Sequence, residues 1–177
     1  MRCVLRSWLK VADLTALSAE DAVRRVLGFG DTVRGLYRSE VWAFEFLEGA
    51  DGPQTLERLA RETNLLVNPN KHAHEIAGGE SLHPRGNAWV LAARPGDGSD
   101  LAETLERHRL VSPAPAVHRG VLWELDLAPD TDRRQVLEEL AVARERRRGL
   151  LTNPHMEDAT LFLDPPTGVS LAGAMPW

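Results

Sequence analysis

The sequence contains a single cysteine, only two lysines and no long apolar run. Cys3 has no second cysteine with which to form a disulfide, and a cysteine-based metal site would need several such residues. No stretch approaches the roughly 18 apolar residues of a membrane-spanning helix. Arginines interrupt the segment 1–10, so it has no signal-peptide core. These absences predict a cytoplasmic protein without a membrane partner.

The overall composition is that of a folded domain. The chain has 177 residues, of which 43% are hydrophobic and 27% charged. This composition excludes global disorder, and the length allows one ordinary domain or two small ones. The net charge is −5, so no overall positive field attracts phosphate backbones. We therefore expect no nucleic-acid partner.

Several residues recur at a fixed spacing. Three pairs lie 81 positions apart: Trp8 and Trp89, Trp42 and Trp123, and Arg38 and Arg119. The pattern Leu-Leu-x-Asn-Pro occurs at 65–69 and again 85 positions later, at 150–154. Four additional residues would fit one turn of an intervening helix and keep its apolar stripe in phase. We interpret the pattern as the duplication of one supersecondary unit; the alternative is a chance match of two unrelated aromatic strands.

The repeat divides the chain into two units. We place the first unit at residues 1–78, a glycine-rich linker at 79–86, the second unit at 87–164 and a tail at 165–177. The glycines and the proline of the linker break both helix and strand. The tail has no hydrophobic period.

Each unit is predicted to follow the order β-α-β-β-α-β. In the first unit we expect strands at 3–11, 32–38, 40–48 and 72–77, with helices beginning near Ser18 and Asp51. In the second unit we expect strands at 88–93, 115–119, 121–127 and 158–163, a helix beginning at Asp100 and a longer helix over 131–149. This order predicts an α+β fold of two tandem ferredoxin-like units, each with an antiparallel sheet and helices on one face.

The first strand of each unit is apolar on both faces. Val4 and Trp8 alternate with Cys3 and Leu5, and Trp89 lies within an apolar run. A solvated sheet face would be polar at every second residue, and large exposed apolar patches mark association surfaces. We therefore expect the open sheet faces to pack together or against another chain, and the protein to form a homo-oligomer.

Few residues are candidates for metal binding or nucleophilic catalysis. His72 and His74 would share one strand face, with His83 nearby, but a metal site needs a further ligand. Their counterparts in the second unit are Glu157 and Ala159, so we favour the interpretation of two edge-strand histidines. Cys3 has no nucleophile motif around it and is interpreted as a buried strand residue.

The remaining candidates are weaker. Glu157 and Asp158 beside His155 have the side chains for general acid–base catalysis, but paired carboxylates at a strand start are more often solvated. The arginines of 144–148 suit the negative end of a helix dipole, and residues 28–30 lack most of a dinucleotide-binding fingerprint. No set of nucleophile, base and orienting group is evident. We expect no catalytic residue, no metal and no cofactor.

Four segments resemble a known family. The sequence LLTNPHMED at 150–158 resembles the LLANPxxEDY element that ends PurS, the small subunit of phosphoribosylformylglycinamidine synthase, and LLVNPN at 65–70 matches the same element. LGFGDTVR at 27–34 resembles the stretch that leads from the first helix of that family into its second strand. Arg119-Gly120, followed by LWE at 122–124, resembles its hairpin. Taken as two copies, the resemblance covers nearly all of residues 1–163.

The resemblance implies a ferredoxin-like subunit that does no chemistry itself. PurS subunits associate through their sheets and bridge the glutaminase and synthetase subunits, whose complex converts formylglycinamide ribonucleotide, ATP and glutamine into an amidine in purine biosynthesis. Two features depart from that family: the chain is a tandem, and the hairpin Gly-Lys is replaced by Gly120-Val121 and Ser39-Glu40. The residues expected at interfaces or in structural motifs are Trp8, Trp89, Arg38, Arg119, Gly120, Asn68, Pro69, Asn153, Pro154, Glu157 and Asp158.

Two other functions remain open at this point. Paired ferredoxin-like units can bind a metabolite at their shared edge, which would make the chain a metabolite-sensing module without a purine role. An enzyme that uses the region of His72 and His74 is the third hypothesis.

Overall fold

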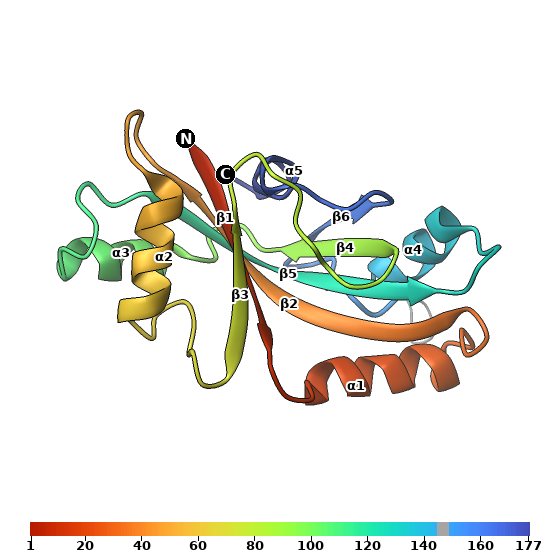
Figure 1. The fold of residues 1–177 in the computed structure, drawn as a ribbon. Coiled ribbons are helices and arrows are strands. Elements are labelled where there is room, and N and C mark those ends of the chain that lie inside the picture. Colours follow the sequence, from red (N-terminus) through yellow and green to blue (C-terminus); the bar gives the residue numbers. More distant parts are fainter. Residues whose placement is uncertain (145–148) are drawn as a thin grey trace.

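The computed structural model describes residues 1–144 and 149–177, and these form one open six-stranded antiparallel sheet with five helices (Figure 1). The strands are β1 (Arg2–Leu9), β2 (Val33–Glu45), β3 (His72–Ala77), β4 (Ala88–Ala93), β5 (Ala116–Leu127) and β6 (Asp158–Phe162). The helices are α1 (Leu14–Asp21), α2 (Gly52–Glu62), α3 (Ser99–Arg107), α4 (Arg133–Ala141) and α5 (Gly168–Gly173), and a π-helical turn, η1 (Ala22–Val26), follows α1. No described helix has the length and apolar character needed to cross a membrane.

The strand order is symmetrical about its central pair. The sheet runs β3-β1-β2-β5-β4-β6, and β2 pairs with β5 along its whole length, from Val33 opposite Leu127 to Glu45 opposite Ala116. Figure 1 shows these two long strands side by side at the middle of the sheet. The two halves of the chain are therefore joined edge to edge in one sheet, and of the two predicted arrangements, the packing of their open sheet faces on each other is wrong.

The two predicted hairpins are single strands. β2 continues through Ser39 and Glu40, and β5 continues through Gly120, without a turn. Ser39 pairs with Leu122 and Glu40 with Val121. At these positions the backbone therefore pairs with the strand of the other half instead of forming a turn. Each half therefore has the order β-α-β-α-β. The polar residues that resembled turn signals lie in the middle of the sheet.

Helices from both halves cover the same face of the sheet. Leu56 and Leu59 of α2 share a core with Leu101 and Leu105 of α3, over Phe44 of β2. At the other end of that face, helices of both halves meet again: Val23 of η1 belongs to the same core as Val136, Leu137 and Leu140 of α4. Each core combines residues from the first half with residues from the second, so the halves complete one another.

The central strands and the helices that follow them keep the spacing of 81 residues. Asp51 is the N-cap of α2 and Asp132 is the N-cap of α4. Each carboxylate accepts a hydrogen bond from the third backbone N–H of its helix, that of Gln54 at 3.0 Å and that of Gln135 at 3.1 Å. The two N-cap aspartates are thus 81 positions apart, the same spacing as that of Trp42 and Trp123.

The flanking strands are related by 85 residues. Val4 pairs with Ala77 in the first half, and Trp89 pairs with Phe162 in the second. Trp89 therefore corresponds to Val4, and its spacing of 81 from Trp8 is a coincidence. That part of the predicted repeat is wrong.

The changes of spacing locate two differences of four residues. The segment from the start of α1 into β2, Leu14 to Ala43, is longer by four than its counterpart Ser99 to Glu124, and it contains η1, whose hydrogen bonds span five residues. The segment from the start of α4 into β6, Arg133 to Phe162, is longer by four than its counterpart Gly52 to Ala77. The helix predicted over 131–149 is wrong beyond Ala141, where α4 ends. Residues 145–148 of that prediction lie outside the described residues.

The opposite face of the sheet is covered by the chain itself. The segment 78–87 crosses it and buries Leu82, and α5 lies on an apolar patch with Leu171 and Ala172 fully buried (Figure 1). The residues of the sheet beneath them include Val4, Val41, Ala43, Trp89, Leu91 and Leu122. The prediction that this face is apolar is confirmed, and the tail, which showed no period in sequence, covers much of it.

The paired helix caps offer a matched test of the duplication. Replacing either Asp51 or Asp132 by alanine is expected to lower the free energy of unfolding by about 1 kcal/mol, because each change removes one N-cap hydrogen bond. Urea unfolding followed by circular dichroism measures both changes. A loss in one variant without a loss in the other would contradict the equivalence of the two helices.

Candidate functional site

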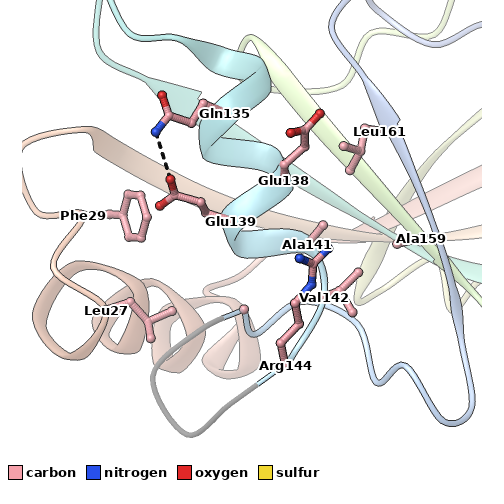
Figure 2. A pocket seen from close by; sticks show the side chains of 11 residues that line it. Leu27, Phe29, Gln135, Glu138, Glu139, Ala141, Val142, Arg144, Ala159 and Leu161 are labelled. Atoms are coloured by element: carbon pink, nitrogen blue, oxygen red, sulfur yellow. Dashed lines mark hydrogen bonds between the residues drawn. The ribbon is translucent and has the colours of Figure 1, made fainter.

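A cavity of about 620 Å³ lies between α4, the connection from α1 to β2, and the edge strand β6 (Figure 2). Its apolar residues are Leu27, Phe29, Ala141, Val142, Ala159 and Leu161, most of them half-buried. Its polar residues are Gln135, Glu138, Glu139 and Arg144, all exposed. Small-molecule sites commonly occupy about 300–1,000 Å³ and combine an apolar lining with a few polar groups.

The polar groups of the cavity come from α4 and from the residues that directly follow it. Glu138 and Glu139 project from α4, and Figure 2 shows the guanidinium of Arg144 directed back toward Ala141. Glu139 accepts a hydrogen bond from Gln135 at 3.0 Å. The arrangement places two carboxylates and one guanidinium around an apolar floor.

The corresponding region of the first half is arranged differently. There His74 lies 3.3 Å from Glu57 of α2, and Arg58 donates to the backbone carbonyl of Leu110 at 2.9 Å. The residues at the positions of His74 and Arg58 in the second half are Ala159 and Glu139. The second half therefore has a methyl group where the first half has the imidazole of His74, and a carboxylate where the first half has the guanidinium of Arg58.

A buried ion-pair network lies at the middle of the sheet, on the face away from α1–α4. Arg6, which is 3% exposed, donates to Glu124 Oε1 at 2.7 Å, and Ser39 Oγ donates to the same oxygen at 2.6 Å. Glu124 Oε2 accepts from the backbone N–H of Arg85 at 2.6 Å, and Arg6 lies 3.3 Å from Glu75. The charged groups of Arg6, Glu75 and Glu124 each have a partner within the network. The network therefore connects β1, β2, β3, β5 and the segment 78–87, and it is not an open ligand site.

The predicted Asn-Pro motifs form two equivalent turns. Asn68 Oδ1 accepts from the N–H of Asn70, and Asn153 Oδ1 accepts from that of His155, at 3.0 and 3.1 Å. Pro69 and Pro154 occupy the positions between them. Such side-chain-to-backbone bonds are typical of Asx turns, so these motifs direct the chain into β3 and β6.

His72 and Glu157 close these turns in the same way. His72 Nδ1 accepts from the backbone N–H of Asn68 at 3.1 Å, and Glu157 Oε2 accepts from that of Asn153 at 2.8 Å. Asp158 follows as the exposed first residue of β6. Within 1–144 and 149–177, no three His, Cys, Asp or Glu residues are grouped as metal ligands.

Arg38 and Arg119 meet in the middle of the helix-covered face. Glu40 lies 2.9 Å from Arg119 and 3.5 Å from Arg38, and Arg119 stacks 5.0 Å from the ring of Trp42. The two arginines are therefore related by the repeat and share one carboxylate. Gly120 beside them is close-packed, since a side chain there would meet the backbone of Ala92.

The two tryptophans predicted at interfaces differ in environment. Trp8 is half-buried with the guanidinium of Arg6 4.4 Å from its ring centre. Trp89 is buried and donates its indole N–H to the carbonyl of Arg85 at 2.7 Å. Cys3 is buried, and burial raises the pKa of its thiol, which disfavours the thiolate. His155 is exposed.

Sequence reasoning missed the most buried polar residues. Glu124 and Ser39 were assigned to strands or turns without a role, although each is a polar residue inside an apolar strand. A polar residue at the centre of such a strand is a signal for a buried hydrogen-bond partner. Its partner lies 85 residues away and could not be identified from sequence.

The last residue described, Trp177, docks on the sheet face away from α1–α4. Its ring lies 4.4 Å from that of His118 and 4.4 Å from the guanidinium of Arg2. Burial, followed by the charge of Arg2, lowers the pKa of His118, whereas Glu45 opposes this effect. The folded state therefore binds a proton at His118 less readily than the unfolded chain does.

This difference predicts a pH dependence of stability. A lowered pKa in the folded state means that stability is greatest above the unfolded-state value, about 6.5 for histidine, and is lost as the pH falls through it. The melting temperature should thus fall less between pH 7.5 and pH 5 in His118→Gln than in the unsubstituted protein. An equal fall in both proteins would contradict the assignment.

No family model matches the chain, and no curated protein matches it.

Proposed function

We propose that the chain is a non-catalytic assembly subunit of the PurS type, a fused pair of units that bridges glutaminase and synthetase subunits of a phosphoribosylformylglycinamidine synthase complex. The observation that carries this proposal is the symmetrical sheet, in which β2 and β5 pair along twelve register positions between the halves. A symmetrical pair is what two associated copies of one unit form. The equivalent Asn-Pro turns support a duplicated origin of the halves.

In this proposal, each half descends from a ferredoxin-like unit whose order of strands and helices has changed. Each half contributes three strands and two sheet-covering helices, and its cores are completed by the other half. A bridging subunit must also present different surfaces to two different partners. The halves have diverged in that respect.

An exposed apolar stripe on α1 is the clearest divergence between the halves. Leu14 is 74% exposed and Leu17 is 50% exposed, one turn apart on one side of the helix. Their counterparts on α3, 85 positions later, are Ser99 and Ala102. Exposed apolar side chains of this kind are typical of protein interfaces, so we assign the stripe to contact with one of the two enzymes.

Native purification of the tagged chain from its host tests the proposal. We expect a glutaminase and a synthetase subunit to co-purify with it, as measured by native mass spectrometry, and deletion of the gene to create a purine requirement. Absence of both partners together with normal growth of the deletion strain without purines would refute the role.

A pair of substitutions tests the stripe within the same experiment. Exchanging Leu14→Ser and Leu17→Ala copies the second-half residues into the first and should reduce co-purification at least tenfold, whereas the stability should change by less than about 0.5 kcal/mol because both side chains are exposed. Val169→Ser, at a 60% exposed position of α5, is the control and should leave the complex intact. Equal recovery of partners by the unsubstituted protein, the double variant of α1 and the Val169→Ser control would exclude the stripe as the contact.

A further inference from the structure

The cavity beside α4 lies where the two halves differ most in chain length. Leu27 and Phe29 come from the segment between the start of α1 and β2, which is four residues longer than its counterpart in the second half. Val142 and Arg144 come from the segment between the start of α4 and β6, which is four residues longer than its counterpart in the first half. Both departures from symmetry thus line one cavity.

The substitutions between the halves explain why the cavity is open. In the first half, the imidazole of His74 bridges to Glu57, and the corresponding residue in the second half is Ala159, which leaves the carboxylate of Glu138 without this neighbour. Arg58 of the first half reaches the Leu110 carbonyl, and Glu139 takes its position. Compared with the first half, the second half therefore has smaller side chains and two fewer basic groups beside this cavity.

The charges of the cavity have a definite arrangement. Glu138 and Glu139 lie on one wall, on α4, and Arg144 follows the end of that helix (Figure 2). Glu138 contacts Arg134 at 2.9 Å, but both side chains are more than half exposed, so this pair holds the carboxylate weakly. The floor between the charges is apolar and includes Phe29, Val142 and Leu161 in half-buried positions.

We propose that this cavity binds a free α-amino acid with an apolar side chain. The ammonium group would be held by Glu139, which lies beside Phe29 in Figure 2, the carboxylate by Arg144, and the side chain by the apolar floor. A guanidinium forms two parallel hydrogen bonds with a carboxylate, and a ligand with both charges satisfies both side chains at once. The volume of about 620 Å³ accommodates a large side chain such as that of phenylalanine. This site does not depend on the proposed assembly role.

Titration calorimetry of the full chain with L-phenylalanine tests the proposal. We expect saturable binding below about 1 mM and a rise in melting temperature at saturation, because a ligand that binds only the folded state stabilises it. N-acetyl-phenylalanine lacks the ammonium charge and phenylalanine amide lacks the carboxylate. Each should bind at least tenfold more weakly, which is the loss expected when a charged hydrogen bond is removed. No heat of binding up to about 10 mM, or equal affinity for all three compounds, would overturn the proposal.

Variants that copy the first half into the second provide the matched protein test. Ala159→His and Glu139→Arg introduce the residues that occupy these places in the first half, and each should reduce affinity for phenylalanine at least tenfold. Glu103→Gln changes an exposed carboxylate of α3 that contacts only Arg107 at 3.8 Å, and should leave affinity unchanged. Circular dichroism verifies that each variant is folded. Unchanged affinity in both folded cavity variants would overturn the assignment, and so would an equal loss in Glu103→Gln.

Discussion

Replacing Glu124 with alanine is expected to lower the free energy of unfolding by about 3–5 kcal/mol, the cost of removing one partner of a buried ion pair. Glu124 is 1% exposed, and its carboxylate accepts from Arg6, from Ser39 and from the backbone of Arg85. Its loss leaves the almost fully buried guanidinium of Arg6 with Glu75, at 3.3 Å, as its remaining carboxylate partner. Equilibrium unfolding in urea, monitored by tryptophan fluorescence, measures the change.

An exposed ion pair of the same sheet provides the control for this prediction. Arg2 and Glu45 are 3.2 Å apart with side chains 40% and 45% exposed, so Glu45→Ala should cost no more than about 1 kcal/mol. Glu124→Gln should fall between the two, because it keeps the shape and some hydrogen bonds but removes the charge. If Glu124→Ala costs no more than Glu45→Ala, the network does not hold the halves together as described.

Truncating Leu171 to alanine should be the second most damaging change, with a cost of about 2–5 kcal/mol. Leu171 is fully buried where α5 packs on the apolar sheet face, beside Leu122 and Met175. The loss of its side chain leaves a cavity between α5 and the sheet and weakens the contact that keeps Trp177 near His118. A lower urea midpoint together with a red-shifted tryptophan emission measures both effects.

A second residue of α5 provides a control that distinguishes the loss of packing from the loss of helix formation. Val169 lies on α5 but is 60% exposed, so Val169→Ala should change stability by less than about 0.5 kcal/mol. Equal effects of the two truncations would mean that α5 does not pack on the sheet in solution.

Local signals in the sequence predicted part of this fold correctly. The N-cap at Asp51 and the proline after it mark the start of α2, where the helix indeed begins. The alternation around Trp42 predicted strand, which β2 confirms. These features depend on residues a few positions apart, so sequence spacing carries them.

Long-range pairing decided the features that were predicted wrongly. Ser39 and Gly120 resemble turn positions, but each lies in a strand whose partner belongs to the other half. Trp8 and Trp89 share a spacing but not a register position, because two connections differ by four residues in opposite senses. The candidate cavity could not be predicted either, since its described lining comes from three separate parts of the chain, near residues 27–29, 135–144 and 159–161.

The amino-acid pattern alone determined the mixed α/β class and the apolar character of the sheet face away from α1–α4, because periodicity and caps are local properties of the sequence. Only the tertiary structure decided that the two halves share one sheet, that α5 covers the apolar face, and that Glu124 and Arg6 form a buried pair. Those outcomes depend on contacts between residues distant in the sequence, such as the 118 positions that separate Arg6 from Glu124. No spacing rule identifies such partners before the chain has folded.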